Sequence, residues 1–272
     1  MKKIQSPSNI LITGGTSGIG EAVAYEYARR GARNIFVCGR NQERLAAVLE
    51  QCRSLGATAA GDLIDVTDTA ALEKWLWACD QTAALDLVFA NAGVGLGGSE
   101  TDANIRRTFD INVGGVINTV LPAIALFTNP SDQRPRRRRQ IALMSSLAGY
   151  HGLPSCPAYS ASKSCVKAWG AALRGSLRPQ GILVSTICPS FVRSRLTDKN
   201  EFHMPFFMET DKAAGIIATR LERNVGLITF PWPMRLAVWV AACLPDVVSD
   251  WILSKLPSSS STASPTVAAG KN

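Results

Sequence analysis

Short apolar runs alternate with longer helical patterns along most of the chain. The runs contain apolar residues mainly in succession rather than in alternation with polar ones, which predicts strands that are covered on both faces. Because helical patterns separate the runs, the predicted strands are joined by βαβ crossovers. We therefore expect an α/β fold with a doubly wound parallel sheet and helices on both faces. The predicted strands lie at 10–12, 34–38, 57–63, 85–89, 141–144 and 182–187.

Composition limits the size and class of the protein. Of its 272 residues, 46% are apolar and 18% are charged, which allows a sizeable core and excludes global disorder. The length fits one domain, which we expect over 1–256. The remaining segment, 257–272, is rich in Ser, Thr, Ala and Pro and is expected to be a disordered tail.

Much of the excess of positive over negative charge comes from one segment of the chain. The formal net charge is +8, and 134–139 contains Arg134 and the run from Arg136 to Arg139. A nucleic-acid-binding surface spreads its charge more broadly, so nucleic acid is not an expected partner. We expect the segment to be a solvated loop, and weak attraction to anionic lipid or nucleic acid is the alternative.

Cysteine and histidine show no pattern of a metal site. The seven cysteines are scattered without CxxC spacing, which fits neither a disulfide framework nor structural zinc. The two histidines are well separated, and we expect His151 beside the pocket and His203 in a lid. No apolar run follows Met1, Lys2 and Lys3, so a signal peptide is not expected and the predicted location is cytoplasmic.

A glycine-rich loop joins the first predicted strand to the first predicted helix. It reads Thr13-Gly14-Gly15-Thr16-Ser17-Gly18-Ile19-Gly20. Three of the glycines, at 14, 18 and 20, let the backbone turn tightly and approach a ligand that a Cβ would keep away. The helix N-terminus that follows offers free N–H groups and a partial positive charge to a pyrophosphate. Between a strand and a helix, such a loop predicts dinucleotide binding in a Rossmann-like fold.

Tyr159 and Lys163 lie four residues apart in a predicted helix, so both side chains emerge from one face. A free tyrosine has a pKa near ~10, which is too high for an efficient base at neutral pH. A nearby ammonium and the positive ring of an oxidised nicotinamide would stabilise the phenolate and lower that pKa. We therefore predict that Tyr159 is a general acid/base, which protonates a carbonyl oxygen in reduction and takes up a hydroxyl proton in oxidation.

Four motifs occur in a fixed order along the chain. They are the Gly-x-x-x-Gly-x-Gly loop, Asn91-Ala92-Gly93, Asn112 in Ile111-Asn112-Val113, and Ser146 followed by Tyr159 and Lys163. With the pair Asp65-Val66, they resemble the short-chain dehydrogenase/reductase family of the classical type over about 10–189. The resemblance implies the Rossmann-like fold and a dehydrogenase or reductase activity on CH–OH groups.

The same resemblance implies a role for each motif. Ser146 orients the substrate oxygen, whereas Ser145 points elsewhere; Asn112 holds a water that links Lys163 to solvent. Lys163 also binds the nicotinamide ribose. The implied cofactor contacts come from the glycine loop, the adenine pair, the cleft motif, the catalytic helix and the end of the sixth strand: Gly14, Thr16, Ser17, Gly18, Ile19, Gly20, Asp65, Val66, Asn91, Ala92, Gly93, Tyr159, Lys163, Pro189 and Ser194.

The end of the second predicted strand distinguishes the two nicotinamide cofactors. An acidic residue there holds the ribose 2′-hydroxyl of NAD. Here Gly39 and Arg40 occupy that position. Without a carboxylate, repulsion of a 2′-phosphate is removed, and the Arg40 guanidinium can bind the phosphate. The sequence therefore favours NADP(H) over NAD(H).

The sequence departs from the family after the sixth strand. The usual Pro-Gly is Pro189-Ser190, and a threonine that contacts the carboxamide is replaced by Ser194. Residues 190–208 resemble the family's variable substrate lid. Four large apolar residues in it suit a hydrophobic substrate or pack the lid onto the core, namely Phe202, Met204, Phe206 and Phe207.

Residues 228–244 form the most apolar late stretch of the chain. The stretch is shorter than a bilayer span and is interrupted by Pro231, Pro233 and Arg235, so a transmembrane helix is not expected. We expect two short helices within about 234–256, at Met234–Cys243 and Val247–Leu256. They would cover the pocket, form a homo-oligomer contact or lie on a membrane surface, and the first two roles are favoured.

Together these patterns predict an NADP(H)-dependent oxidoreductase that transfers a hydride between nicotinamide and the carbonyl/alcohol pair of a small, hydrophobic molecule. The alternatives are a non-enzymatic NADP(H)-binding sensor and a membrane-associated scaffold on the same fold. Both Tyr159 and Lys163 are present, which favours the enzyme.

Overall fold

The computed structural model describes residues 5–95, 100–193, 206–245 and 247–248. The described residues form one seven-stranded sheet with the order β3-β2-β1-β4-β5-β6-β7, in which every pair of neighbours is parallel. The doubly wound α/β fold predicted from the sequence is therefore confirmed. The strands are β1 Asn9–Thr13, β2 Asn34–Gly39, β3 Thr58–Leu63, β4 Leu87–Ala90, β5 Gln140–Met144, β6 Leu183–Pro189 and β7 Leu227–Phe230.

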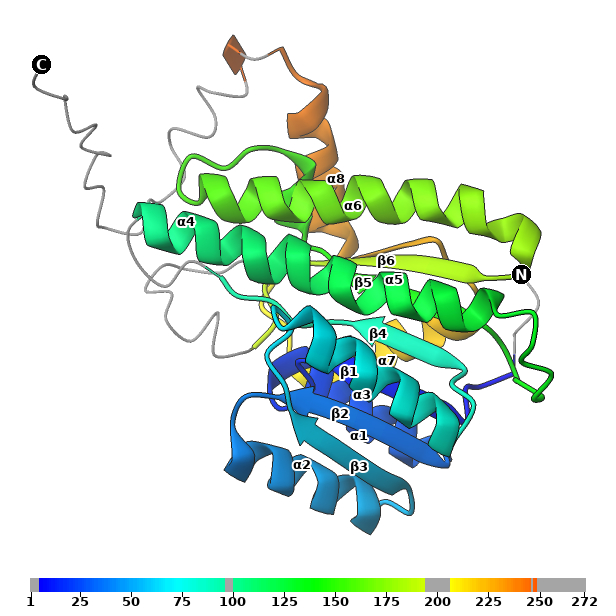
Figure 1. The fold of residues 1–272 in the computed structure, drawn as a ribbon. Coiled ribbons are helices and arrows are strands. Elements are labelled where there is room, and N and C mark those ends of the chain that lie inside the picture. Colours follow the sequence, from blue (N-terminus) through cyan, green and yellow to red (C-terminus); the bar gives the residue numbers. More distant parts are fainter. Residues whose placement is uncertain (1–4, 96–99, 194–205, 246, 249–272) are drawn as a thin grey trace, which may run out of the picture.

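Helices cover both faces of the sheet (Figure 1). One apolar core lies between the sheet and α1, α2 and α7, and a second lies between the sheet and α3, α5 and α6. The helices are α1 Gly18–Arg29, α2 Gln42–Ser54, α3 Thr69–Thr82, α4 Asp102–Phe109, α5 Gly115–Thr128, α6 Pro157–Leu177, α7 Thr210–Glu222 and α8 Trp232–Cys243, with short turns η1 Asp110–Gly114, η2 Leu147–Tyr150 and η3 Arg178–Gln180.

The strand boundaries follow the polar residues at their ends. The sequence predicts a strand at 85–89, but the fourth strand begins at Leu87. The Asp86 carboxylate instead accepts hydrogen bonds from the backbone N–H groups of Ser8 (2.7 Å) and Asn9 (3.1 Å). Asp86 therefore anchors the start of β1. The seventh strand, β7, was not predicted, because three of its four residues belong to the apolar stretch at 228–244, in which only helices were expected.

The sheet reverses its strand order between β1 and β4. Ile12 in β1 pairs with Val37 of β2 on one side and with Phe89 of β4 on the other. After β1 the chain continues to β2, and after β4 it continues to β5 on the opposite side of the sheet. In doubly wound folds a crevice opens outside the carboxyl ends of the strands at this point, and ligands bind there. The glycine loop and Asn91 follow β1 and β4 at that edge.

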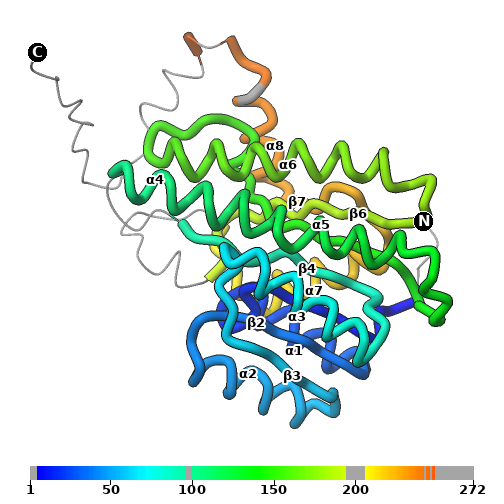
Figure 2. The backbone as a smooth tube through the Cα atoms, in the orientation of Figure 1, coloured from blue at the N-terminus to red at the C-terminus, as the bar shows by residue number. Residues whose placement is uncertain are grey.

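A π-helical turn joins α4 to α5, and the tube in Figure 2 shows one continuous helical path through them. Asp102–Thr128 is the one helix, within the described part of the chain, that is long and apolar enough to cross a membrane. More than half of its apolar window (56%) is buried in the body of the protein. α5 packs against the sheet and against α3, which is the environment of a core helix.

The arginine-rich segment before β5 is not the solvated loop that the sequence predicts. The Arg136 side chain is only 4% exposed, and Asp80 is fully buried. Arg136 pairs with Asp80 at 2.8 Å and also with Asp132, and Arg134 pairs with both acids. The four side chains form a buried ion cluster at the amino-terminal edge of β5. Its pairs hold the pKa of Asp132 well below the ordinary value.

Arg138 is also buried, beside Tyr27 of α1 and Glu222 of α7. Burial lowers the pKa of the Arg138 guanidinium, and the nearby Glu222 opposes that shift. The prediction for this segment was wrong because a run of arginines is usually a solvated surface, while Asp80 and Glu222, which lie beside it in the fold, are far away in sequence.

We expect Asp80→Asn to lower the free energy of unfolding by about 3–5 kcal/mol, because it leaves the buried Arg136 and the partly exposed Arg134 without the charge of Asp80. Chemical denaturation measures the change. Asp102→Asn is the matched control, since both side chains of the Asp102–Arg106 pair are exposed and solvent screening leaves such a pair with little effect on stability. Equal effects of the two substitutions would show that the buried cluster does not stabilise the fold.

Candidate active site

The glycine loop between β1 and α1 is shaped by two positive-φ glycines, Gly14 (φ 63°) and Gly18 (φ 59°). A Cβ on Gly14 would lie 2.6 Å from the Cα of Ala92, and a Cβ on Gly20 would collide with the Asn91 side-chain amide. The loop therefore needs glycine both for its backbone conformation and for its close approach to the segment after β4.

Asn91 joins this loop to the end of β4. Its side-chain Nδ2 donates to the carbonyl oxygens of Thr13 (3.1 Å) and Gly14 (3.0 Å). Its backbone N–H donates to Thr13 Oγ1 at 3.2 Å. The two loops on either side of the crevice are therefore held together. Asn91, Ala92 and Gly93, predicted as a cleft motif, lie beside the glycine loop.

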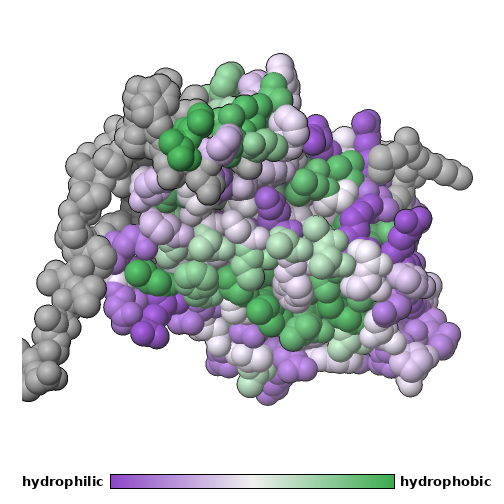
Figure 3. Space-filling model, turned by 90° about the horizontal axis from the view of Figure 1, so that it is seen from above, coloured by the Kyte–Doolittle hydropathy of each residue, from purple (hydrophilic) through white to green (hydrophobic). Residues whose placement is uncertain are grey.

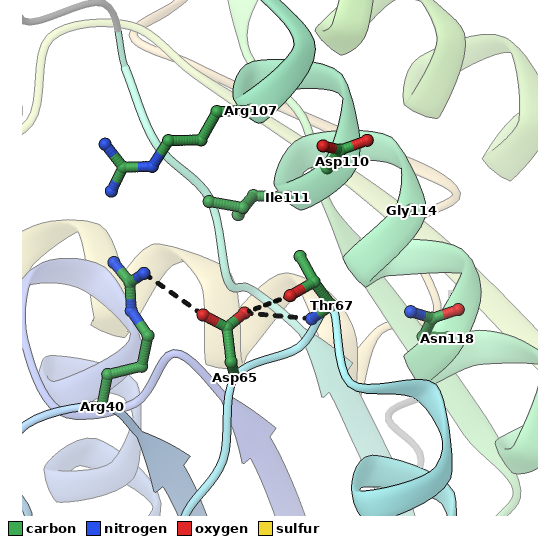
Figure 4. A pocket seen from close by; sticks show the side chains of 8 residues that line it. All are labelled: Arg40, Asp65, Thr67, Arg107, Asp110, Ile111, Gly114 and Asn118. Carbon is green, nitrogen blue, oxygen red and sulfur yellow. Dashed lines mark hydrogen bonds and ion pairs between the residues drawn. The ribbon is translucent and has the colours of Figure 1, made fainter. Parts of the chain in front are cut away.

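A cavity of about 420 Å³ opens beside Arg40, which follows β2 (Figure 4). Arg40 forms an ion pair with Asp65 at 3.3 Å, and both side chains are substantially exposed. The other Asp65 oxygen accepts from the N–H (3.0 Å) and hydroxyl (2.9 Å) of Thr67. These hydrogen bonds and Arg40 lower the pKa of Asp65 against the opposing effect of burial. The lining residues are Arg40, Asp65, Thr67, Arg107, Asp110, Ile111, Gly114 and Asn118.

Val66 lies next to this cavity rather than in its lining. Its side chain is buried against Gly115, and its carbonyl accepts a hydrogen bond from Asn118 at 2.9 Å. Thr16 fills the space beside Gly39, where a Cβ would collide with the threonine side chain. Thr16 therefore leaves no room for a side chain larger than that of glycine at position 39.

Asn112 lies in the π-helical turn η1 and is fully buried. Its Oδ1 accepts from the N–H of Val94 (2.8 Å), and its Nδ2 donates to the carbonyl of Val94 (3.0 Å) and to Ser162 Oγ (3.1 Å). Asn112 thus connects the segment after β4 to α6. Turns of this kind are frequent at functional sites because they turn one side chain out of helical register.

α6 places Tyr159 and Lys163 on one face, as predicted. The Lys163 Nζ lies 5.8 Å from the centre of the Tyr159 ring and donates to the carbonyl of Met144 at 3.2 Å. A Cβ on Gly93 would lie 3.2 Å from that Nζ and 3.1 Å from Asn112 Oδ1. Lys163 and Asn112 therefore converge on Gly93 in the cleft.

Ser146 and Ser145 point in different directions at the end of β5. Ser146 Oγ accepts from the N–H of Ala148 (3.1 Å), and the Ser146 hydroxyl interacts with the phenol of Tyr159. Ser145 is buried, and its hydroxyl donates to the carbonyl of Lys163 at 2.7 Å. Ser146 is thus the serine that faces Tyr159, and Ser145 stabilises α6.

Burial dominates the electrostatics of the Tyr159–Lys163 pair. It raises the pKa of Tyr159 to about 12, and the hydrogen bond with Ser146 opposes the shift. Burial lowers the pKa of Lys163 to about 8. The protein without a cofactor therefore holds a neutral phenol beside an ammonium that is still charged at neutral pH. The sequence predicted that Lys163 lowers the pKa of Tyr159, but Lys163 is not among the groups that shift this pKa here.

β6 brings Pro189 to the same edge of the sheet. The N–H of Ser190 donates to the carbonyl of Phe230 at 2.9 Å, which holds the start of the lid against β7. Farther along, Phe206 (58% exposed) and Phe207 (37% exposed) lie at the surface. Ser194, Phe202, His203 and Met204 lie outside the described residues, as do most of Val247–Leu256 and the tail at 257–272.

Comparisons with known proteins agree with the fold and its motifs. Residues 8–204 match the family described as short chain dehydrogenase. An uncharacterized oxidoreductase of Myxococcus xanthus is 36% identical over 250 residues, which cover 88% of this chain and 94% of the relative. The 11-beta-hydroxysteroid dehydrogenase A of Sesamum indicum is 28% identical over 268 residues, or 89% of this chain and 73% of the relative.

Two solved structures share the fold at low sequence identity. A short-chain dehydrogenase/reductase from Burkholderia phymatum in complex with NAD has a TM-score of 0.77 at 22% identity, over 93% of this chain and 97% of that one. A short-chain dehydrogenase from Sphingobium yanoikuyae in complex with NADPH has a TM-score of 0.74 at 23% identity, over 94% and 98%. The chain is an oxidoreductase of the Rossmann-like type. It belongs to the short-chain dehydrogenase/reductase family.

Sequence reasoning missed several residues that shape this site. Arg107 and Thr67 line the cavity beside Arg40, and Ser162 holds Asn112. None of the three belongs to a motif quoted above. Arg107 could have been identified by its spacing of four residues from Ile111, because this spacing places both side chains on one side of the helix.

Lys163→Met removes the buried ammonium and keeps a side chain of similar length. We expect it to increase the free energy of unfolding at pH 7 by up to about 3 kcal/mol, because the folded-state pKa is depressed. Between pH 8 and pH 10.5 the lysine holds a proton in the unfolded protein that it has lost in the folded one, so the stability of wild type should rise with pH. The stabilisation of Lys163→Met relative to wild type should therefore shrink across this range. Denaturation curves across this range measure it. Lys212→Met, at an exposed site on α7, is the control, and a variant less stable than wild type at pH 7 would contradict the assignment.

Proposed function

We propose that the protein is an NADP(H)-dependent oxidoreductase that transfers a hydride between nicotinamide and the carbonyl/alcohol pair of a small, hydrophobic substrate. The observation that carries the proposal is that Tyr159 contacts both Ser146 and Lys163, while Lys163 lies beside Gly93 in the segment that follows β4, one of the two strands between which the strand order reverses. Relatives of the same fold are described in complex with NAD and with NADPH, which supports a nicotinamide cofactor.

The residues at the crevice fit a dinucleotide. The glycine loop brings bare backbone to the N-terminus of α1, and this is the arrangement that accommodates a pyrophosphate. In this assignment the loop residues Thr16, Ser17 and Ile19 hold the diphosphate with the glycines. Asn91–Gly93, Pro189 and the described end of β6 line the nicotinamide side. A bound nicotinamide would supply or accept the hydride.

The cavity beside Arg40 supports the preference for NADP(H). Arg107 lines it from α4 and, among the described residues, makes no ion pair or hydrogen bond, so two guanidinium groups border the same space. Figure 4 shows both on the same side of Asp65. A 2′-phosphate would compete with Asp65 for Arg40 and gain Arg107 as a second partner. With Val66, Asp65 would border the adenine.

The state of Tyr159 suits reduction of a carbonyl. A phenol with a pKa of about 12 is protonated at neutral pH, so Tyr159 is ready to donate its proton to the carbonyl oxygen as that oxygen gains negative charge. Ser146 would orient the same oxygen. The Lys163 ammonium stabilises the phenolate that remains. Asn112 positions the segment after β4, and a water held there would connect Lys163 to solvent.

The free state of all seven cysteines fits a reducing, cytoplasmic location. The exposed side chain of Leu121 on α5 is compatible with a homo-oligomer contact. A sensor or scaffold without turnover is less well supported than an enzyme, since the complete Tyr159–Lys163 pair is present with Ser146.

Tyr159→Phe should lower kcat by about 10²–10⁴-fold and leave NADPH binding unchanged, because only the transferable proton is lost. NADPH oxidation with a panel of carbonyl compounds measures turnover, and fluorescence titration measures binding. Tyr25→Phe on α1, where the hydroxyl donates to Glu21, should retain full activity. A fully active Tyr159→Phe variant would remove the acid/base role.

Arg40→Ala should weaken NADPH binding by about 10–100-fold and leave NADH binding unchanged, because a charge-assisted hydrogen bond to the phosphate is lost. Arg107→Ala should act in the same direction to a smaller extent. Its neighbour Arg106 pairs with Asp102 away from the cavity, so Arg106→Ala is the matched control. Equal losses for NADPH and NADH would show that neither arginine reads the phosphate.

A further inference from the structure

Helix α8 is apolar on every side, and none of its residues whose side chains the structure describes is buried. Between Trp232 and Cys243 its only charged residue is Arg235. Trp232 is 74% exposed, Trp239 56%, Leu236 51% and Val240 44%. A helix that is hydrophobic all round is normally enclosed by a protein core or by lipid. Water is thus an unfavourable environment for α8.

The large exposed side chains of α8 lie along one side of the helix. The four are spaced as i, i+4, i+7 and i+8, which aligns them along one stripe. Val247 and Val248, which follow α8 in the chain, are exposed as well. Figure 1 shows α8 extending away from the sheet past α6, and Figure 3 shows hydrophobic side chains gathered over it. We name this surface, Trp232–Cys243 with 247–248, the α8 surface.

Charge and shape favour lipid over a protein partner as its occupant. The sequence between Glu222 and Asp246 contains Arg223 and Arg235 but no acidic residue, which suits anionic headgroups. Side chains outside the stripe, such as Ala237, are also exposed, and a protein groove would cover only one side of the helix. Trp232 and Trp239 are the residue type that favours the membrane–water interface.

The length of α8 determines how it would sit in a bilayer. Its 12 residues extend over about 18 Å, whereas the hydrocarbon core is about 30 Å thick. The helix is too short to cross and would enter one leaflet from the surface.

We propose that the α8 surface inserts into the interface of an anionic membrane and that the substrate enters the active site from the lipid phase. α8 contacts β7 and η2, and η2 begins directly after Ser146. The helix therefore links the membrane surface to the residues around Tyr159. The entry route depends on the proposed function, whereas membrane binding does not.

Flotation of the full-length protein with vesicles tests the membrane contact. We expect wild type to float with vesicles of phosphatidylcholine and phosphatidylglycerol, and less with phosphatidylcholine alone. Leu236→Glu combined with Trp239→Glu should lower the partition coefficient at least about tenfold, because two charges would enter the apolar layer. Leu63→Glu at the end of β3 is the control for a charge at an exposed apolar site, since Leu63 is 52% exposed and Leu236 51%.

Three outcomes would overturn the membrane contact. The first is that wild type does not float, and the second is that the double variant floats like wild type. A wild-type dimer in size-exclusion chromatography that does not float and that dissociates in the double variant would show that a second copy covers α8. Circular dichroism confirms that each variant is folded.

A kinetic comparison tests the entry route separately. NADPH oxidation is measured with a water-soluble carbonyl and with a long-chain carbonyl dissolved in the vesicles. The double variant should retain its rate with the soluble compound and lose it with the lipid-dissolved one. Equal rates of wild type and variant with both would refute entry from lipid. If wild type turns over neither compound, the proposed function fails while flotation still reports on α8.

Discussion

The arrangement of the site depends on the amide of Asn91, which holds together two loops that leave the sheet in opposite directions. Pairing between β1 and β4 ends at Thr13 and Ala90, which would leave the loops beyond these residues free to separate. Hydrogen bonds from Asn91 to the carbonyls of Thr13 and Gly14 prevent this. Gly14 and Gly20 must then be glycines, because the two loops are in contact. The shape of the crevice is thus set by the protein itself.

Charge is buried at both edges of the sheet, but with different consequences. At the amino-terminal edge, the acids and arginines around Asp80 neutralise one another, and the cluster fixes the chain in place. At the carboxyl-terminal edge, Lys163 has a backbone carbonyl as its hydrogen-bond partner and, in the part of the chain that the structure describes, no carboxylate. Its burial is a cost to folding, and it keeps the residue poised to respond to charge on Tyr159. Stability and chemistry are therefore located at opposite ends of the same strands.

The sequence predicted the parts of this protein that depend on local patterns. Six strands, the glycine loop and the Tyr159–Lys163 helix could be read directly, because each follows from apolar runs or from spacing within one turn. Long-range pairing could not be read. The arginines at 134 and 136 meet Asp80 only after the chain has folded, and Arg107 reaches the cavity beside Arg40 from a helix that no motif marks. The sequence also did not show how deeply Tyr159 is buried, so its raised pKa was not expected.

The contact between Gly39 and Thr16 restricts how the proposed preference for NADP(H) could change in evolution. An aspartate introduced at position 39 would place its Cβ against both branches of the threonine side chain. The simplest single substitution toward an NAD-type site is therefore sterically blocked. A smaller residue at position 16 would have to appear first, so the order of the two mutations is fixed by geometry rather than by chance.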